Sequence, residues 1–491
     1  MALVFFKRLA LVAALSTITF PVLAGVLAHD NDPSSKTYEN IQNMIRNVSS
    51  SSIQENNHIW IVRVFAILCF VWYGVIVLLS SLGLIVVRKK YTQISPVVTR
   101  EAVTGSEGVT ILRPLKGIDT EMEACLTSAF SQDYPKFEII FCIASESDPA
   151  VQVAQRLIGQ FPYVDAKILI GEGHYGPNPK INNLAQGYEQ AKYDIIWVLD
   201  SNVWVAPGTL ARSVDAFYKA PNIQLVHHLP MCMSIVSAWD NNWGSKLDEM
   251  FMLTAHSKFY SAINAVAIAP CVMGKSNLYR RSDLDRASGK QKGHGIRVFA
   301  QYIAEDNMIA DALWKAGGRT ALTGDSVVQP LANVDFEGYV SRRIRWLRVR
   351  RYMVLAATLL EPTTECFLCG IFGSFAISVL WLSNETASYF SWIFFITHLS
   401  IWCASDYWHF HNLIQYSNME HTNSPFFVSP YYSPEYSTTK TRPFLTSWLP
   451  IWILREVLAL PIWVIAMCGH KILWRNKPFR IKSDLTAEEI L

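Results

Sequence analysis

One apolar run constrains this chain more than any other feature of its sequence. Residues 64–87 are almost entirely apolar and are followed directly by Arg88, Lys89 and Lys90. About 20 apolar residues are enough to cross the hydrocarbon core of a bilayer, and basic residues at the end of a span favour the cytosolic side. We therefore predict a transmembrane helix over 64–87, with the next part of the chain in the cytosol.

The chain also opens on an apolar stretch. Residues 1–28 have a basic start at Lys7 and Arg8, an apolar run and small residues at the end, a pattern typical of a secretion signal. The pattern leaves open whether this segment is cleaved. The polar residues 29–63, which contain a sequon at Asn47, are then expected on the lumenal side.

Further apolar runs lie near the C-terminus, over 366–382, 389–403 and 448–468. They predict membrane segments within 353–470, interrupted by a polar loop over 416–442 and followed by a basic cytosolic tail over 471–491. The last run contains Arg455 and Glu456, and a charge at the bilayer centre costs roughly 2.5–3.5 kcal/mol. We therefore expect this run to be kinked, partly buried in protein or re-entrant, and the number of crossings stays open.

The composition excludes two other classes of protein. With 51% apolar and 17% charged residues the chain can form a core, which excludes disorder. A net charge of +3 gives no basic excess for nucleic-acid binding. The nine cysteines are thinly spread and form no disulfide framework, which fits a domain in a reducing compartment.

Between the membrane segments, β-rich runs alternate with helical stretches, which predicts a mostly parallel sheet covered by helices. The predicted strands are 109–112, 137–144, 166–170, 194–199, 223–227, 273–278 and 319–322. The predicted helices are 121–131, 149–160, 181–191, 207–219 and 302–316. In open α/β sheets ligands bind beyond the carboxyl ends of the strands, so the residues that follow each strand are the place to look for chemistry.

Three aspartates stand at such positions. Asp200 ends a fully apolar strand, Asp148 follows the strand 137–144, and Asp306 precedes an apolar helix. A carboxylate at the end of a buried strand is costly unless something binds it, so Asp200 indicates a function. Asp148 and Asp306 also fit structural roles, as a turn or cap residue and as an acid in the first turn of a helix.

A fourth feature is a cluster of six arginines within residues 342–351, around Trp346. On a helix, Arg342, Arg345 and Trp346 share one face. A basic helix resting on anionic lipid headgroups accounts for the arginines but not for the tryptophan. His227, the last residue of a predicted strand, fits either a packed residue or a substrate contact.

This constellation resembles the D, D, D, (Q/R)xxRW pattern of membrane-bound, inverting nucleotide-sugar glycosyltransferases with a GT-A fold. Several longer stretches are similar to the ceramide glucosyltransferase family, and their number and order are more specific than one motif. They include ILRPLKGID (111–119), NPKINNLAQGYEQAKYDIIWVLDSN (178–202), FAQYIAEDNMIADAL (299–313) and SRRIRWLRVRRYMV (341–354). The resemblance implies an α/β, GT-A-like catalytic domain over 105–352 in the cytosol, with N- and C-terminal transmembrane helices.

The resemblance also implies a role for each matching residue. Asp306 is the catalytic base, and Asp200 meets the donor diphosphate and its metal ion, Mg²⁺ or Mn²⁺. The other expected donor-binding residues are Asp148, Lys180, Arg342, Arg345 and Trp346, and His227 is a candidate substrate contact. One departure concerns the metal: Asp200-Ser201-Asn202 lacks the second acid of a D-x-D motif, which weakens metal affinity.

The expected activity is transfer of glucose from UDP-glucose to the primary hydroxyl of ceramide, with inversion, on the cytosolic face of the Golgi or endoplasmic reticulum. The expected partners are therefore both substrates and the bilayer, with no nucleic acid. Two alternatives stay open: a processive polysaccharide synthase, chitin- or hyaluronan-like, and a catalytically inactive membrane scaffold. The residues do not choose between glucose and galactose.

Overall fold

The computed structural model describes residues 52–92, 107–235, 242–382, 387–419, 424–428, 444–474 and 477–490. Two compact units share the chain: Met1–Leu78 with Thr363–Ala404, and Leu79–Pro362 with Ser405–Leu491. The predicted signal segment 1–28, the sequon at Asn47 and most of the loop 416–442 lie outside the described residues. The domain boundaries expected from the sequence stay predictions.

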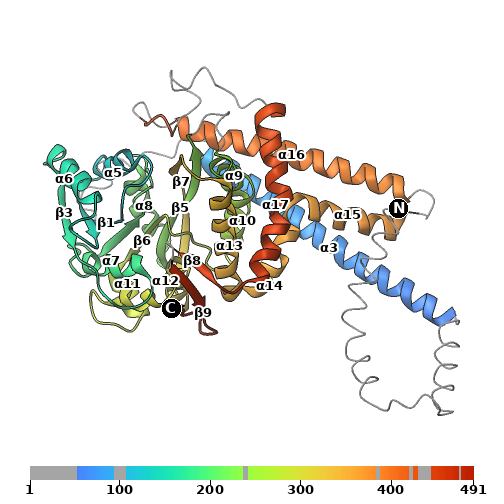
Figure 1. Ribbon diagram of the computed structural model, residues 1–491, viewed down its shortest axis with the longest axis horizontal. Helices are drawn as coiled ribbons and strands as arrows, with labels where there is room; N and C mark the ends of the chain where they lie inside the picture. The colour runs from blue at the N-terminus through green and yellow to red at the C-terminus, as the bar shows by residue number, and fades with distance from the viewer. Residues whose placement is uncertain are drawn as a thin grey trace, which may run out of the picture. The chain divides into compact units, whose positions relative to one another are not determined.

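The second unit is built on a seven-stranded sheet with the order β3-β2-β1-β4-β6-β5-β7 (Figure 1). β6 runs antiparallel to both of its neighbours, β4 and β5, and the other pairs are parallel. The strands are β1 (Val109–Leu115), β2 (Phe137–Ile143), β3 (Asp165–Ile170), β4 (Ile195–Leu199), β5 (Ile223–Ser234), β6 (Ser276–Arg280) and β7 (Arg319–Leu331). The mostly parallel sheet predicted from the sequence is confirmed.

Three strands run at least three residues further than predicted: β1 to Leu115, β5 to Ser234 and β7 to Leu331. β5 was expected to end at residue 227. It continues to Ser234, with a register shift between His227 and Leu229, and it pairs with β7 along this whole extension. Among the described residues, β5 pairs with β6 only as far as His227, so the extension is a two-stranded arm of the sheet in which proline is tolerated.

Helices cover both faces of the sheet because its strands are apolar on both faces. Ile111 and Trp197 point into the core beneath α5 (Met122–Phe130), α6 (Ala150–Gln160) and α8 (Thr209–Tyr218). Their neighbours Leu112 and Val198 point into the core beneath α7 (Pro179–Glu189), α11 (Arg281–Ala287) and α12 (Glu305–Lys315). The five helices predicted between the strands are present, and α12 begins three residues later than the predicted start at 302.

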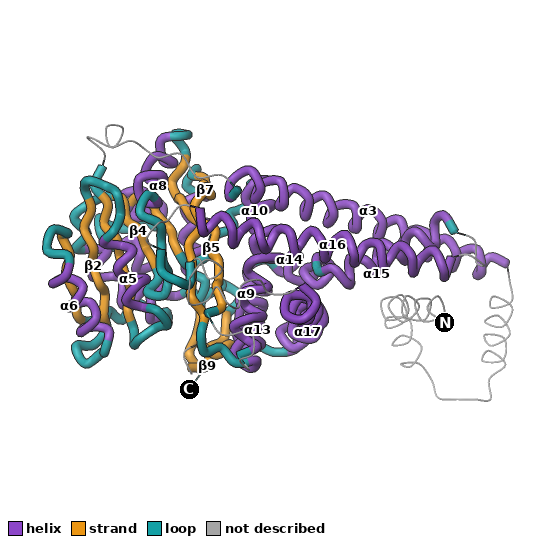
Figure 2. Tube along the Cα trace, turned by 90° about the horizontal axis from the view of Figure 1, so that it is seen from above, coloured by secondary structure: helices purple, strands orange, loops and turns teal. Residues whose placement is uncertain are grey.

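A layer of helices adjoins the β5–β7 end of the sheet. It contains α9 (Trp243–Phe251), α10 (Ser257–Val266), α13 (Phe336–Met353), α14 (Leu355–Leu360) and α17 (Leu449–Cys468). α9, α13 and α17 pack against one another (Figure 2). α9 and α10 were not predicted, because polar residues such as Lys246, Asp248 and Lys258 interrupt the apolar pattern yet are buried here.

Two described helical stretches are long and apolar enough to cross a membrane, Ile59–Tyr91 within α3 (Ser52–Tyr91) and Phe444–Cys468, which contains α17. A third candidate is the bent pair Leu355–Thr364 and Cys366–Trp381, which meet at 81°. The first stretch contains the predicted span 64–87. The predicted apolar runs 366–382 and 389–403 correspond to α15 (Cys366–Trp381) and α16 (Ala387–Met419), and α16 continues past the predicted end at 403.

The charges in the last apolar run are accommodated by burial in protein. α17 is one continuous helix through Pro461, and Arg455 and Glu456 are ion-paired with each other and almost fully buried. A paired charge is far cheaper to bury than a lone one. The helix therefore keeps its length although its sequence contains two charges.

The C-terminal residues fold back as a small antiparallel sheet of β8 (Ile472–Trp474), β9 (Lys477–Ile481) and β10 (Ala487–Glu489). Ile472, Phe479 and Ile481 form its buried face, and this face packs against Ile303, Val349 and Tyr352. Ile303 lies just before α12, and the other two residues lie on α13. The C-terminal sheet thus supports two elements that bear predicted site residues.

We expect Phe479→Ala to release this sheet. Phe479 is 2% exposed, and removal of a fully buried phenylalanine side chain costs about 3–5 kcal/mol. Limited trypsin digestion should then cleave after Arg480 and Lys482 much faster than in the parent protein. Leu473→Ala is the matched control, because Leu473 is 65% exposed in the same sheet. Equal cleavage rates in the two variants would contradict this packing.

Candidate active site

The loop after β4 is fixed by the sheet. The N–H of Asp200 donates to the carbonyl oxygen of Lys275 at 3.1 Å, which extends the β4–β6 pairing by one step beyond Leu199 and Ser276. Behind the loop, the buried guanidinium of Arg113 donates to the carbonyl oxygens of Ser201 and Val203, both at 3.3 Å. The backbone that carries Asp200 is therefore set by the strands on either side.

The carboxylate of Asp200 lies between two lysines. Its Oδ1 is 2.8 Å from Nζ of Lys180, at the start of α7, and its Oδ2 is 3.4 Å from Nζ of Lys275. Burial by itself would raise the pKa of Asp200, but the two ammonium charges outweigh it and hold that pKa below its usual value. Asp200 is therefore ionised at neutral pH.

Lys180 also joins Asp200 to the start of α12. Its Nζ is 3.1 Å from a carboxylate oxygen of Glu305 and donates to the carbonyl oxygen of Gly274, also at 3.1 Å. Burial disfavours the ammonium, but the charges of Asp200 and Glu305 raise the pKa of Lys180 overall. One cation thus holds two carboxylates from different elements.

Asp306 follows Glu305 in the first turn of α12. Its Oδ1 accepts the N–H of Asn307 at 2.9 Å. Burial, together with the negative charge of Glu305, raises the pKa of Asp306 to about 7. This carboxyl group can therefore accept or release a proton near neutral pH, as a general acid or base requires.

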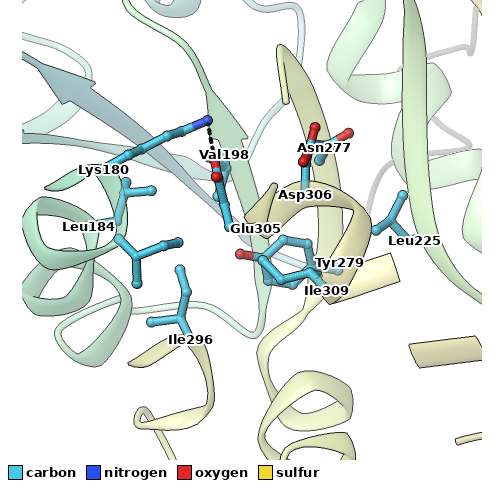
Figure 3. Close-up of a pocket in the computed structure, with 11 residues that line it drawn as sticks. Lys180, Leu184, Val198, Leu225, Asn277, Tyr279, Ile296, Glu305, Asp306 and Ile309 are labelled. Atoms are coloured by element: carbon cyan, nitrogen blue, oxygen red, sulfur yellow. Dashed lines mark ion pairs between the residues drawn. The ribbon is translucent and has the colours of Figure 1, made fainter. Parts of the chain in front are cut away.

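A pocket opens beside this cluster (Figure 3). Its polar lining consists of Lys180, Asn277, Tyr279, Glu305 and Asp306, and the Lys180–Glu305 ion pair lies at its edge. Its other side is apolar and is formed by Ile181, Leu184, Val198, Leu225, Ile296 and Ile309. The charged groups are thus held against a water-poor wall, where electrostatic interactions are strong.

Asn178 connects the two helices that supply these charges. Its Oδ1 accepts the N–H groups of Lys180 and Ile181 at 2.9 and 3.2 Å and so caps α7. Its Nδ2 donates to the carbonyl oxygen of Tyr302 at 2.7 Å and to Glu305 at 2.9 Å. Asn178 is buried, and it is a positioning residue that sets α7 against α12.

The arginine-tryptophan helix is α13, and its first half packs on α9. Arg342 forms an ion pair with the buried Asp248 at 3.1 Å and lies over the ring of Trp346, 4.7 Å from its centroid. Trp346 in turn contacts Phe251, with 6.4 Å between ring centroids. Arg342 and Trp346 therefore share a helix face, as their spacing predicts. Arg345 is partly buried on the same helix.

Asp148 and His227 make contacts outside this cluster. Both carboxylate oxygens of Asp148 accept the N–H of Gly117 at 3.0 Å, and one also accepts the N–H of Ala150 at 2.9 Å, which is the capping role that its position allows. His227 is fully buried, with Nδ1 2.6 Å from the hydroxyl of Tyr260, and burial lowers its pKa to about 3. Their roles in donor or substrate binding stay predictions.

Three charged residues of this region were not predicted: Lys275, Glu305 and Asp248. Glu305 stands next to Asp306 in the sequence, and the pairing of two acids at the start of a helix could have indicated it. Lys275 lies within the predicted strand 273–278, where a lysine beside a glycine is unusual. Asp248 gives no such signal, because its role depends on the packing of α9 against α13.

Comparison with known proteins supplies the family. The model of glycosyl transferase family 21 matches residues 73–487. The chain belongs to this family. It is 50% identical over 481 residues to the ceramide glucosyltransferase of Komagataella phaffii, covering 87% of this chain and 92% of the relative. The resemblance to ceramide glucosyltransferases is thereby confirmed, and with the sheet described above so is the GT-A-like α/β class.

Other relatives carry the same name. The ceramide glucosyltransferase of Candida albicans is 42% identical over 487 residues, covering 78% of this chain and 88% of its own length. Ceramide glucosyltransferase 1 of Caenorhabditis elegans is 26% identical over 374 residues, covering 76% of this chain and 72% of its own length. Among solved structures, a mannosyltransferase of Pyrobaculum calidifontis in complex with GDP-Man and Mn²⁺ overlaps with a TM-score of 0.43 at 17% identity, over 73% of this chain and 98% of that one.

A substitution at Gly274 tests how tightly the charged groups of Lys180 and Asp306 are packed. A Cβ on this residue would lie 3.1 Å from Oδ2 of Asp306 and 3.5 Å from Nζ of Lys180. We expect Gly274→Ala to displace one of these groups and lower the turnover number roughly tenfold to hundredfold, as small displacements of reacting groups do. The melting temperature should change little.

Gly159→Ala is the control, because a Cβ at Gly159 meets nothing within 4 Å. Turnover by Gly274→Ala at the level of this control would show that the space beside Asp306 is not needed.

Proposed function

We propose that this glycosyltransferase moves glucose from UDP-glucose to the primary hydroxyl of ceramide, with inversion, on the cytosolic face of a Golgi or endoplasmic reticulum membrane. One observation carries the proposal: Lys180 joins Asp200 and Glu305 beside Asp306, whose pKa is raised to about 7. In this arrangement a proton acceptor lies next to fixed charges suited to a sugar diphosphate.

The donor diphosphate becomes more negative as its bond to the sugar breaks. Fixed cations aimed at that charge lower the barrier. Lys180 provides one at the edge of the pocket. Arg342 and Arg345 provide guanidinium groups, which bind phosphate oxygens in pairs, and Trp346 and Asp248 hold Arg342 in place. Asp148 is assigned to the nucleotide or sugar end of the donor.

The acceptor hydroxyl is a poor nucleophile until it loses its proton. In the proposed step the ceramide oxygen bonds to the anomeric carbon while the bond from that carbon to the diphosphate breaks, and Asp306 takes the hydroxyl proton. One displacement turns the α-linked donor into a β-glucoside, and no covalent bond to the protein forms. His227 remains a candidate contact for the bound substrates.

A divalent cation, Mg²⁺ or Mn²⁺, is part of the proposal, and Asp200 is the residue that would hold it. Mg²⁺ is commonly bound through one or two carboxylates with phosphate oxygens as further ligands, so a single aspartate fits. The described residues contain no group of three or more His, Cys, Asp or Glu that could hold a metal ion without such help. When bound, the cation would neutralise charge on the leaving diphosphate.

The membrane segments support ceramide as the acceptor. The hydroxyls of a ceramide lie at headgroup level, and α13 packs along α17, which is long and apolar enough to cross a membrane. Basic residues gather on α13, where anionic headgroups would attract them. The cytosolic side is favoured by Arg88, Lys89 and Lys90 at the end of α3.

Product analysis tests the proposal. The detergent-purified chain is incubated with ceramide and radiolabelled UDP-glucose or UDP-galactose, and the product is extracted into organic solvent and digested with a β-glucosidase. We expect a β-glucosylceramide from UDP-glucose alone. A polymeric product, a galactosylated lipid or no transfer at all would overturn the proposal.

The base is tested in the same assay with Asp306→Asn. We expect turnover to fall by about 10²–10⁴-fold with nearly unchanged UDP binding, and Asp311→Asn on the same helix to behave like the parent. Because the raised pKa of Asp306 is about 7 and a base acts in its ionised form, the parent's kcat/KM should rise with pH below about 7 and level off above it. A pH-independent rate between pH 5 and 8 would exclude this assignment.

A further inference from the structure

Both oxygens of the Asp200 carboxylate already have cationic partners. Lys180 lies 2.8 Å from Oδ1 and Lys275 lies 3.4 Å from Oδ2. Nζ of Lys275 also donates to Oδ1 of Asn202 at 3.3 Å, and Asn202 stands where a D-x-D motif would have its second acid. At the loop after β4, two lysines therefore face the carboxylate of Asp200, and Lys180 is also paired with Glu305.

The fold fixes Lys275 at this place. Its carbonyl oxygen accepts the N–H of Asp200 at 3.1 Å, and its own N–H donates to the carbonyl oxygen of Met273 at 2.8 Å. Its side chain is only 15% exposed. A surface lysine samples many rotamers, whereas the pairing of β4 with β6 brings this one to Asp200 with little freedom left to lose.

This arrangement has two consequences for a sugar diphosphate. The two ammonium groups, at opposite oxygens of Asp200, offer the diphosphate fixed positive charge without any metal ion. A divalent cation that binds Oδ2 of Asp200 would displace Lys275 from that oxygen, and the two positive charges would repel each other. Lys275 and a metal ion thus compete for the same carboxylate oxygen.

We propose that Lys275 is a fixed cation of the donor diphosphate site, and that Lys275 and a divalent metal ion are alternative partners of Asp200. The inference rests on the proposed function, because that function places a nucleoside diphosphate at this loop. It assigns a donor-site role to a lysine outside the D, D, D, (Q/R)xxRW pattern. It also predicts that the protein binds UDP when no metal is present.

The test measures UDP binding by isothermal titration calorimetry on the detergent-purified full chain, in EDTA and in Mn²⁺. We expect the parent protein to bind UDP in EDTA. In Lys275→Met the affinity in EDTA should fall about tenfold or more, since a charge-assisted hydrogen bond is lost. Mn²⁺ should restore most of it, because Asp200 is then free to hold the metal.

A second readout follows the metal itself. Free Mn²⁺ is measured by electron paramagnetic resonance during titration in the presence of UDP. We expect Lys275→Met to bind Mn²⁺ more tightly than the parent, and Lys275→Arg, which keeps the charge, to resemble the parent in both measurements. Lys315→Met is the control, because Lys315 is a 76% exposed lysine that is paired with Asp311 within α12.

Two results would overturn the inference: no UDP binding by the parent in EDTA, or unchanged UDP and Mn²⁺ affinities in Lys275→Met. UDP binding by the parent in EDTA tests the inference even if Lys275→Met does not fold. The melting temperature of each variant shows whether that variant has folded. Failure of the proposed function has a different signature. In that case the parent binds UDP in EDTA, yet no glucosylceramide forms.

Discussion

The ion cluster around Lys180 is the interaction on which the rest of the site depends. Asp200 follows β4 and Glu305 begins α12, and Asp306 adds a third carboxyl beside them. Without a cation among them, these acids would repel one another at the edge of an apolar pocket, and removal of one partner from a buried pair costs about 3–5 kcal/mol. Lys180 therefore makes it possible for three acids to gather at the carboxyl end of β4.

Buried charges are also paired with opposite charges in the helical layer beside the sheet. Arg342 and Asp248 join α13 to α9, and Lys258 and Asp406, both fully buried and 2.8 Å apart, join α10 to α16. Such pairs add little net stability when compared with apolar residues of the same size, but loss of either partner would leave a buried charge unpaired. The arginine-tryptophan helix is thus positioned by charge pairing on α9 and by packing along α17.

The sequence was sufficient to predict the sheet and the residues at its carboxyl ends, because strands and the turns after them are local patterns. Asp200 and Asp306 were found in this way, whereas Lys180 was expected only from the family resemblance, and the three lie together. The contact of Lys275 with Asp200 could not be predicted, since it exists only through the β4–β6 register across 75 residues of sequence. Asp248 and the C-terminal sheet likewise act through packing between distant segments, for which the sequence pattern has no local sign.

A double-mutant cycle on Lys180 and Asp200 tests the central claim most directly. UDP binding is measured for Lys180→Met, Asp200→Asn and the double variant. If both groups belong to one ion cluster at the donor site, each single substitution alters the affinity for UDP. The change in binding free energy of the double variant then differs from the sum of the changes in the two single variants by about 0.5–3 kcal/mol. Additive losses, or unchanged affinity in both single variants, would contradict the account.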